Sequence, residues 1–225
     1  MLFDLFSGGS SLTLIVNLFV RVFVIFCVLP IHEYAHALVA YKLGDNTAKY
    51  SGRLTISPLA HIDWYGALLM VLAGVGWAKP VPINMRNFKM QNKKLAMAIT
   101  AFAGPISNIL MAFIFTFITV AISVFVPETT VTAAIYSFFS LAANINITLA
   151  VFNLIPVPPL DGSRLVTLLV PDKYYYQIMR YERYIALGFM ALILIGVLDT
   201  PLAVLSDALY RLVFKLASYP FRLFI

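Results

Sequence analysis

The sequence predicts an all-α polytopic membrane protein of about five transmembrane segments, with a short re-entrant or β-hairpin element between the first two spans. Three observations lead to this fold class. Of the 225 residues, 61% are hydrophobic and only 12% are charged, whereas about 25% are charged in an ordinary soluble domain. The mean hydropathy is +0.90. Apolar runs long enough to cross a bilayer core alternate with short basic stretches.

The formal net charge of +6 is distributed as in a multi-pass membrane protein. Fifteen of the sixteen Lys and Arg residues fall within residues 42–94, 164–183 and 211–222, between or beside apolar runs. Because cytoplasmic loops carry such an excess of basic residues, we expect the N-terminus outside and the C-terminus in the cytoplasm. From the short, single-module chain we expect a bacterial or archaeal plasma membrane. The bilayer explains this charge better than a nucleic-acid partner does, and we expect none.

We expect residues 1–225 to form one membrane domain, with a core at about 11–170 and C-terminal helices at about 182–218. The single cysteine excludes an intrachain disulfide. The predicted helical segments run from Ser10 or Ser11 to about Leu43, and over about 95–126, 131–154, 184–198 and 201–216.

The stretch between the first two spans is different in kind. Residues 45–65 show turn residues followed by a β-like alternation, which favours a strand or hairpin at the membrane surface. Residues 66–77 are apolar but too few to span, which fits a re-entrant segment. Residues 79–84 contain two prolines and must be extended.

The sequence HEYAH at residues 32–36 lies inside the first apolar run. On a helix, His32 and His36 project from one face and can bind one metal ion. In zinc peptidases with the HExxH pattern, the Glu beside the first His does not bind the metal but takes a proton from the metal's water. Five-residue matches also arise by chance, but ionisable groups in a membrane-like segment are costly and mark function by default.

A third histidine and a carboxylate follow the first span. His61 and Asp63 lie two residues apart, beside a tryptophan suited to the membrane interface. Either side chain could be an additional metal ligand, or the two could pair with each other. We favour a supporting role outside the ligand shell.

The third span ends in NLIPVPPLDG at residues 153–162. Three prolines in four positions break the helix and fix an irregular backbone, which is tolerated at membrane depth only against protein or a wet cavity. Asp161 on this stiff loop is suited to be a third metal ligand. It could equally cap the following helix, and its two oxygens allow both roles.

Two His, one carboxylate and a position left to water make the ligand set of a catalytic zinc. We therefore expect one Zn²⁺ per chain, bound by His32, His36 and Asp161, with Glu33 as the general base of peptide hydrolysis. The amides of Asn108 or Asn153 could bind the loosened substrate backbone or the developing oxyanion. The extended residues 79–84 could pair with that backbone, or form a plain connecting loop.

At these motifs the sequence resembles the site-2 protease family of intramembrane zinc metalloproteases, in particular its compact prokaryotic members without a PDZ domain. The resemblance covers roughly residues 20–170. It rests on HEYAH, SGRLTISPLAHIDWYG, GWAKPVPIN, AGPISN and NLIPVPPLDG, in this order. It implies an endopeptidase that cleaves in or near transmembrane segments of membrane proteins. It also implies the same zinc ligands and base, with Asn108 and Asn153 on the substrate side.

Two other classes of protein compete with this interpretation. A divalent-metal transporter also carries His and Asp residues at membrane depth, but it has no need of a non-ligating Glu beside the first His. A catalytically silent membrane scaffold has no need of an intact set of His32, Glu33, His36 and Asp161.

The charge distribution also predicts that the active site lies toward the cytoplasmic side of the membrane.

Overall fold

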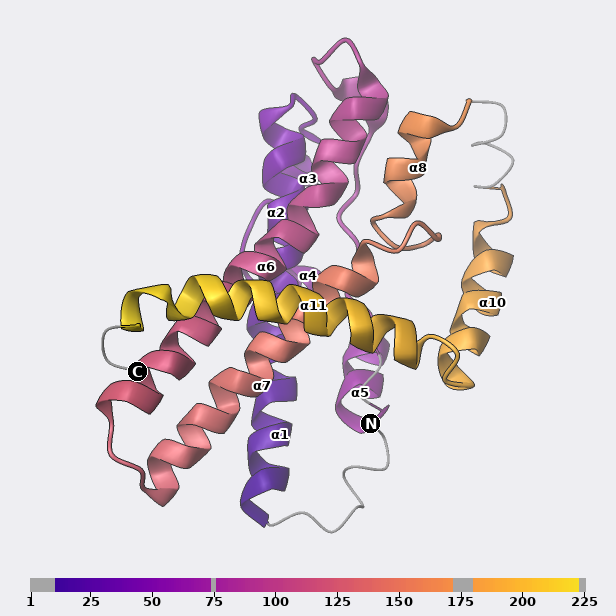
Figure 1. Cartoon of the computed structure of the whole chain (residues 1–225). Coiled ribbons are helices and arrows are strands. Elements are labelled where there is room, and N and C mark those ends of the chain that lie inside the picture. Colours follow the sequence, from indigo (N-terminus) through magenta and orange to yellow (C-terminus); the bar gives the residue numbers. More distant parts are fainter. Residues whose placement is uncertain (1–10, 74–75, 172–179, 223–225) are drawn as a thin grey trace.

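The computed structural model is all-helical in the part of the chain it describes, which is every residue except 1–10, 74–75, 172–179 and 223–225 (Figure 1). Its elements are α1 (Ser11–Phe23), the π-helical turn η2 (Val24–Val28), α2 (Leu29–Lys42), α3 (Thr47–Tyr50), α4 (Pro58–His61), α5 (Trp64–Ala73), the 3₁₀ turn η3 (Met85–Asn87), α6 (Lys93–Phe125), α7 (Thr130–Asn153), α8 (Ser163–Leu169), α10 (Glu182–Leu194), α11 (Asp199–Ser218) and the 3₁₀ turn η4 (Tyr219–Phe221).

Three helices among the described residues are long and apolar enough to cross a membrane: 12–42, 93–125 and 130–153. They correspond to the first three predicted spans. The fourth and fifth predicted segments fall on α10 and α11, which are not among them, so the total of about five spans stays a prediction. α6 and α7 form an antiparallel hairpin, α1 packs on α7, α2 packs on α6, and α11 runs across both helices of the hairpin (Figure 1).

The first span is one long helix interrupted by the π-helical turn η2 just before Pro30. Proline has no N–H to donate and its ring crowds the preceding turn, and the wider turn η2 lies directly before it in the chain. On the bundle side, Val20, Val24 and Val28 form a buried cluster with Met111 and Ala142 of the hairpin. This packing fixes the rotation of the helix that carries HEYAH.

The predicted strand within residues 45–65 is wrong. The described residues there form the short helices α3 and α4 with irregular backbone between them, and only an isolated β-bridge joins Ile62 to Ala78. A strand requires a partner along its length, and here the buried Arg53 instead donates to the carbonyl of Ala60, which folds the segment back on itself.

α5 has ten residues, too few to span a bilayer. The chain returns beside it, because a Cβ on Gly66 would collide with the backbone of Trp77 and one on Gly76 with the carbonyl of Gly66. This close backbone approach is open only to glycine. The returning segment 78–84 then passes alongside α2 as an extended chain.

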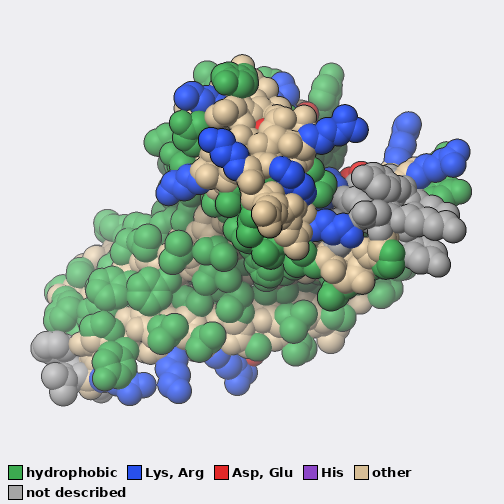
Figure 2. Space-filling view, turned by 90° about the horizontal axis from the view of Figure 1, so that it is seen from above, with side chains coloured by type: hydrophobic (Ala, Val, Ile, Leu, Met, Phe, Trp, Pro, Cys, Tyr) green, Lys and Arg blue, Asp and Glu red, His purple; other side chains and the backbone are tan. Residues whose placement is uncertain are grey.

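Lys and Arg side chains gather around one end of the molecule, where α2 ends and α6 begins, while hydrophobic side chains cover much of the remaining surface on that view (Figure 2). Further basic side chains lie along one edge. Lys42 lies in the last turn of α2 and Lys93 begins α6. Part of the predicted cytoplasmic block at 164–183 lies outside the described residues.

Asp45 joins the end of α2 to the segment that follows residue 84. Its carboxylate accepts hydrogen bonds from the hydroxyl and N–H of Thr47, the N–H of Asn84 and the side-chain amide of Asn87, at 2.5–3.1 Å. Burial opposes ionisation of Asp45, but these hydrogen bonds outweigh it and lower its pKa. The ionised carboxylate therefore stabilises the fold.

Replacing Asp45 with Asn should destabilise the protein by roughly 1.5–3 kcal/mol at pH 7, because charge-assisted hydrogen bonds are lost. Since the folded pKa lies below the unfolded value of about 3.9, the contribution is complete above about pH 4 and disappears as pH falls through the folded pKa. The difference between the two proteins in unfolding titrations should therefore narrow below about pH 4.

Asp207→Asn is the matched control for this substitution. Asp207 forms an exposed i,i+4 pair with Arg211 at 2.7 Å, and such pairs contribute less than about 1 kcal/mol. An Asp45→Asn protein no less stable than Asp207→Asn would show that the Asp45 contacts do not stabilise the fold.

Candidate metal centre

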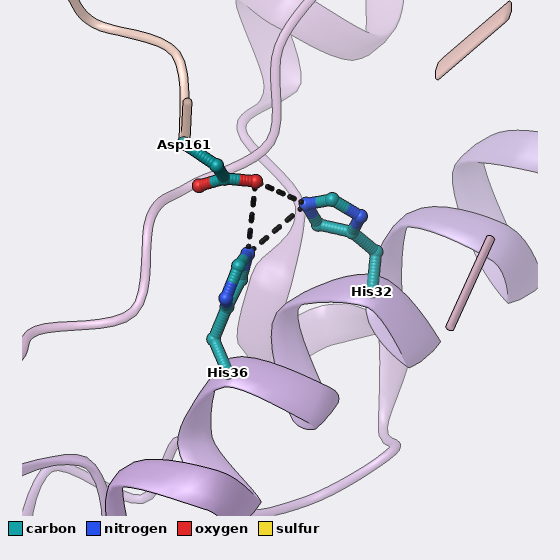
Figure 3. A group of neighbouring side chains, drawn as sticks. All are labelled: His32, His36 and Asp161. Carbon is teal, nitrogen blue, oxygen red and sulfur yellow. Dashed lines mark hydrogen bonds and ion pairs between the residues drawn. The ribbon is translucent and has the colours of Figure 1, made fainter. Parts of the chain in front are cut away.

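Three donor atoms converge between α2, which carries His32 and His36, and the loop after α7, which carries Asp161. The distances are 3.1 Å between His32 Nε2 and His36 Nε2, and 3.2 Å from each of these nitrogens to Asp161 Oδ2 (Figure 3). Among the described residues, His32, His36 and Asp161 are the one set of three or more His, Cys, Asp or Glu side chains placed so that they could bind a metal ion. The sequence predicted these three residues.

The triangle has the dimensions of a zinc site. Tetrahedral Zn²⁺ with bonds of about 2.0–2.2 Å has neighbouring ligand atoms about 3.3 Å apart. Both imidazoles are only 5% exposed, and Asp161 Oδ2 is a buried atom that accepts no hydrogen bond from the described residues. Lone pairs removed from water and directed at one point need a cation, so the residues present fit the metal.

His36 is oriented from behind by α6. Its Nδ1 lies 2.8 Å from the carbonyl oxygen of Thr100, and because a carbonyl only accepts, Nδ1 carries the proton and Nε2 is left with its lone pair for a metal. His32 Nδ1 has no hydrogen-bond partner among the described residues. The Thr100 carbonyl was not found by sequence reasoning, since backbone acceptors carry no residue signature.

Gly104 brings α6 against the two imidazoles. A Cβ at this position would lie 2.5 Å from His32 Cε1 and 2.6 Å from His32 Nε2, and closer still to His36 Nε2. No side chain fits at that distance, so glycine is required for α6 to contact α2 here. The sequence does not show that the two predicted metal-ligand histidines would be the neighbours of this glycine.

Asp161 is held by a compact turn. Gly162 donates its N–H to the carbonyl of Asn153 at 2.6 Å, and Arg164 donates its N–H to the carbonyl of Asp161 at 2.9 Å. A Cβ on Gly162 would collide with the carbonyls of Leu154 and Ile155. The stiff proline-rich loop that the sequence predicted therefore presents the carboxylate to the two histidines.

Glu33 lies next to the metal triangle in sequence but takes no part in it. Its Oε2 accepts a hydrogen bond of 3.0 Å from the backbone N–H of Val81, in the extended segment 78–84. Glu33 is half-buried. This partner could not be found from the sequence, because the sequence does not show which backbone N–H the fold brings to Glu33.

The structure places His61 and Asp63 outside the metal triangle. His61 is fully buried, and its Nε2 hydrogen-bonds to the carbonyl of Thr55 at 2.7 Å. Asp63 accepts hydrogen bonds from the N–H groups of Tyr65 and Gly66, at the start of α5. The two side chains therefore neither pair with each other nor join the group around His32.

The two predicted amides differ in their surroundings. Asn108 lies one helical turn beyond Gly104 on the same side of α6; it is 1% exposed, and neither its oxygen nor its nitrogen has a partner among the described residues. Asn153 donates to the carbonyl of Leu149 at 3.1 Å. A buried amide with no partner is costly, so Asn108 is the better candidate for a group that awaits a ligand.

Comparison with known proteins identifies the family. The model of "Peptidase family M50" matches residues 118–197, which include the Asp161 loop. A protein of Bacillus subtilis named "Putative zinc metalloprotease YwhC" is 42% identical over 173 residues, covering 76% of each chain. The chain belongs to the site-2 protease family, peptidase family M50. It is a zinc metalloprotease with apolar membrane helices.

More distant relatives carry similar names. "Putative zinc metalloprotease Rip2" of Mycolicibacterium smegmatis is 27% identical over 139 residues, covering 60% of this chain and 51% of the relative. "Putative zinc metalloprotease MJ0611" of Methanocaldococcus jannaschii is 27% identical over 141 residues, covering 60% and 62%. No solved structure matches the chain. Zinc is the metal that both the family and the His-His-Asp triangle support.

Gly104→Ala should weaken zinc binding by about 10–100-fold, the range seen when groups that orient metal ligands are disturbed. The new Cβ displaces both imidazoles. Zinc affinity can be measured by competition with a chromophoric chelator, followed by metal analysis of the purified protein. Gly188→Ala is the matched control, because a Cβ at Gly188 meets nothing within 4 Å. Equal affinities for the two variants would refute the close packing of α6 on the histidines.

Proposed function

We propose that this metalloprotease is an intramembrane endopeptidase that hydrolyses peptide bonds in or near the transmembrane segments of other membrane proteins. The observation that carries this proposal is the location of its metal-binding triangle. His32 and His36 lie within a helix long and apolar enough to cross a membrane. Ionisable groups at membrane depth mark function by default, and a metalloprotease site at this depth suits a peptide chain at the same depth.

We assign one Zn²⁺ to His32 Nε2, His36 Nε2 and Asp161 Oδ2. When bound, zinc lowers the pKa of water at its open position to about 7 and polarises the peptide carbonyl. The Thr100 carbonyl keeps His36 in the tautomer that binds metal. Gly104 leaves room for both rings, and the turn around Gly162 holds the carboxylate.

We assign Glu33 as the general base. Glu33 takes a proton from the attacking water as the oxygen adds to the carbonyl carbon of the peptide. The C–N bond then breaks, and Glu33 returns the proton to the leaving nitrogen. Its Oε2 is engaged by Val81, so the other oxygen is the one available for this transfer.

Asn108 and Asn153 are assigned to the substrate side. Asn108 supports this assignment best, because its buried amide has both a free donor and a free acceptor among the described residues. An amide donor near the reacting carbonyl can stabilise the developing oxyanion. Asn153 is the last residue of α7, and its carbonyl accepts a hydrogen bond from the N–H of Gly162, the residue after Asp161.

The orientation we propose follows from the distribution of charge. The basic end of the molecule (Figure 2) is assigned to the cytoplasm and the N-terminus to the outside. The C-terminus is assigned to the cytoplasm from the sequence alone, whereas in the structure Phe221 packs on Phe117 and Phe125 toward the other end of α6. The active site then lies toward the cytoplasmic side, from which water can reach it. The partners are the lipid bilayer and a transmembrane protein substrate.

Glu33→Gln tests the hydrolytic role. The amide cannot accept the proton, so cleavage of a test transmembrane substrate should fall by about 10²–10⁴-fold. Bound zinc should stay at about one equivalent, because Glu33 is not assigned as a ligand. Cleavage would be followed by gel assay in reconstituted membranes, with zinc measured by metal analysis.

The exposed Glu128→Gln serves as the control for this substitution and should cleave within about threefold of wild type. Full cleavage by Glu33→Gln would rule out a general base at this position. Zinc uptake into vesicles by wild type without any cleavage would favour a transporter instead.

The orientation can be tested with single cysteines in a Cys27→Ser background. Ser51 and Thr130 are exposed and lie at opposite ends of the described bundle's long helices. In right-side-out vesicles, a membrane-impermeant maleimide should label Thr130→Cys, and it should label Ser51→Cys only after the vesicles are opened. The reverse pattern would invert the proposed topology.

A further inference from the structure

The backbone N–H of Val81 holds the Glu33 carboxylate, and we propose that Val81 is a positioning residue that sets the orientation of the general base. This inference rests on the proposed function, since it gives Glu33 that role. The hydrogen bond of 3.0 Å joins Val81 N to Glu33 Oε2 across 48 residues of sequence. Within the described part of the chain, the Glu33 side chain makes no other hydrogen bond. Such charge-assisted contacts are stronger than neutral ones.

The segment that carries Val81 is fastened on both sides. Before it, Lys79 donates its N–H to the carbonyl of His61 at 2.8 Å. After it, Asn84 donates its N–H to Asp45 Oδ2 at 2.7 Å. The extended chain 79–84, fixed at both ends, has little freedom to move. The N–H of Val81 is therefore held in place before substrate arrives.

The two neighbouring prolines make Val81 the unique donor at this point. Pro80 and Pro82 have no N–H, so a shift of the segment by one residue in either direction would place no donor against Glu33. The sequence Pro80-Val81-Pro82 thus fixes the register of the segment on the base. While Glu33 holds Val81, residues 80–82 offer an added strand only carbonyl acceptors.

The consequence is a carboxylate with one oxygen anchored and one free. Glu33 follows His32 directly on α2, so a carboxylate anchored at Oε2 keeps Oε1 in a constant place relative to the metal ligands. Misplacing a catalytic group by about 1 Å can cost about 10²-fold in rate. Loss of the Val81 donor should therefore lower kcat, with little effect on KM or on zinc content.

The first arm of the test removes a single N–H. Replacing Val81 by its α-hydroxy acid analogue converts the amide to an ester and keeps the side chain. We expect kcat for a transmembrane substrate to fall about 10–100-fold, with KM within threefold and zinc at about one equivalent. The matched control is the same replacement at Ile83, whose N–H makes no hydrogen bond among the described residues. It should leave kcat within about threefold.

The second arm does not depend on activity. The chain contains two Pro–Val bonds, at 80–81 and 156–157, so labelling with carbonyl-¹³C proline and ¹⁵N valine gives two amide signals. We expect Glu33→Ala to speed hydrogen exchange at Val81 by about tenfold or more. Val157, whose N–H donates to the carbonyl of Ile155 at 2.8 Å, is the internal reference and should not change.

The possible results distinguish a failure of the Val81 positioning role from a failure of the proposed endopeptidase function. Cleavage by the Val81 ester at the wild-type rate or faster would overturn the positioning role, and so would unchanged exchange at Val81 in Glu33→Ala. A loss of zinc from the Val81 ester would assign the contact to structure alone. A wild-type protein that binds zinc but cleaves no transmembrane substrate would refute the proposed function, while the exchange measurement would still decide whether Val81 binds Glu33.

Discussion

The structure depends on the convergence of three donor atoms inside an apolar bundle. Two imidazole nitrogens and one carboxylate oxygen lie 3.1–3.2 Å from one another, with their lone pairs removed from water. Without a cation this arrangement is unfavourable. With zinc it becomes a cross-link between the first span and the loop after the third. Metal binding and the packing of these helices are therefore coupled.

α6 is shaped around this constraint. Thr100 and Gly104 are four residues apart, and they present to α2 a carbonyl that orients His36 and a bare backbone that leaves room for both rings. Asn108 continues the same stripe one turn further on. One face of a single helix thus packs against the two histidines and carries a buried amide that has no partner among the described residues.

The extended segment 78–84 connects the periphery of the molecule to its chemistry. Asp45 at the end of α2 and His61 after the first span fix its two sides, and Val81 between them contacts Glu33. Residues that look like surface-turn chemistry in the sequence are therefore linked, through the backbone of this segment, to the Glu33 carboxylate. The N–H groups inside a helix are already bonded to carbonyls of the same helix. An extended segment beside α2 can instead offer a backbone N–H to Glu33.

The sequence by itself determined the membrane class, the first three long helices and the metal triangle. These follow from local rules: apolar length, the four-residue spacing of His32 and His36 on one helix face, and the stiff proline loop that carries Asp161. It did not determine the backbone of residues 45–65, where a β-like alternation found no partner strand. Tertiary structure alone decided that His61 lies apart from the triangle, that Thr100 and Gly104 contact its histidines, and that Val81 contacts Glu33. The physical reason is that carbonyls, N–H groups and the absence of a side chain act only through which neighbour the fold brings to them.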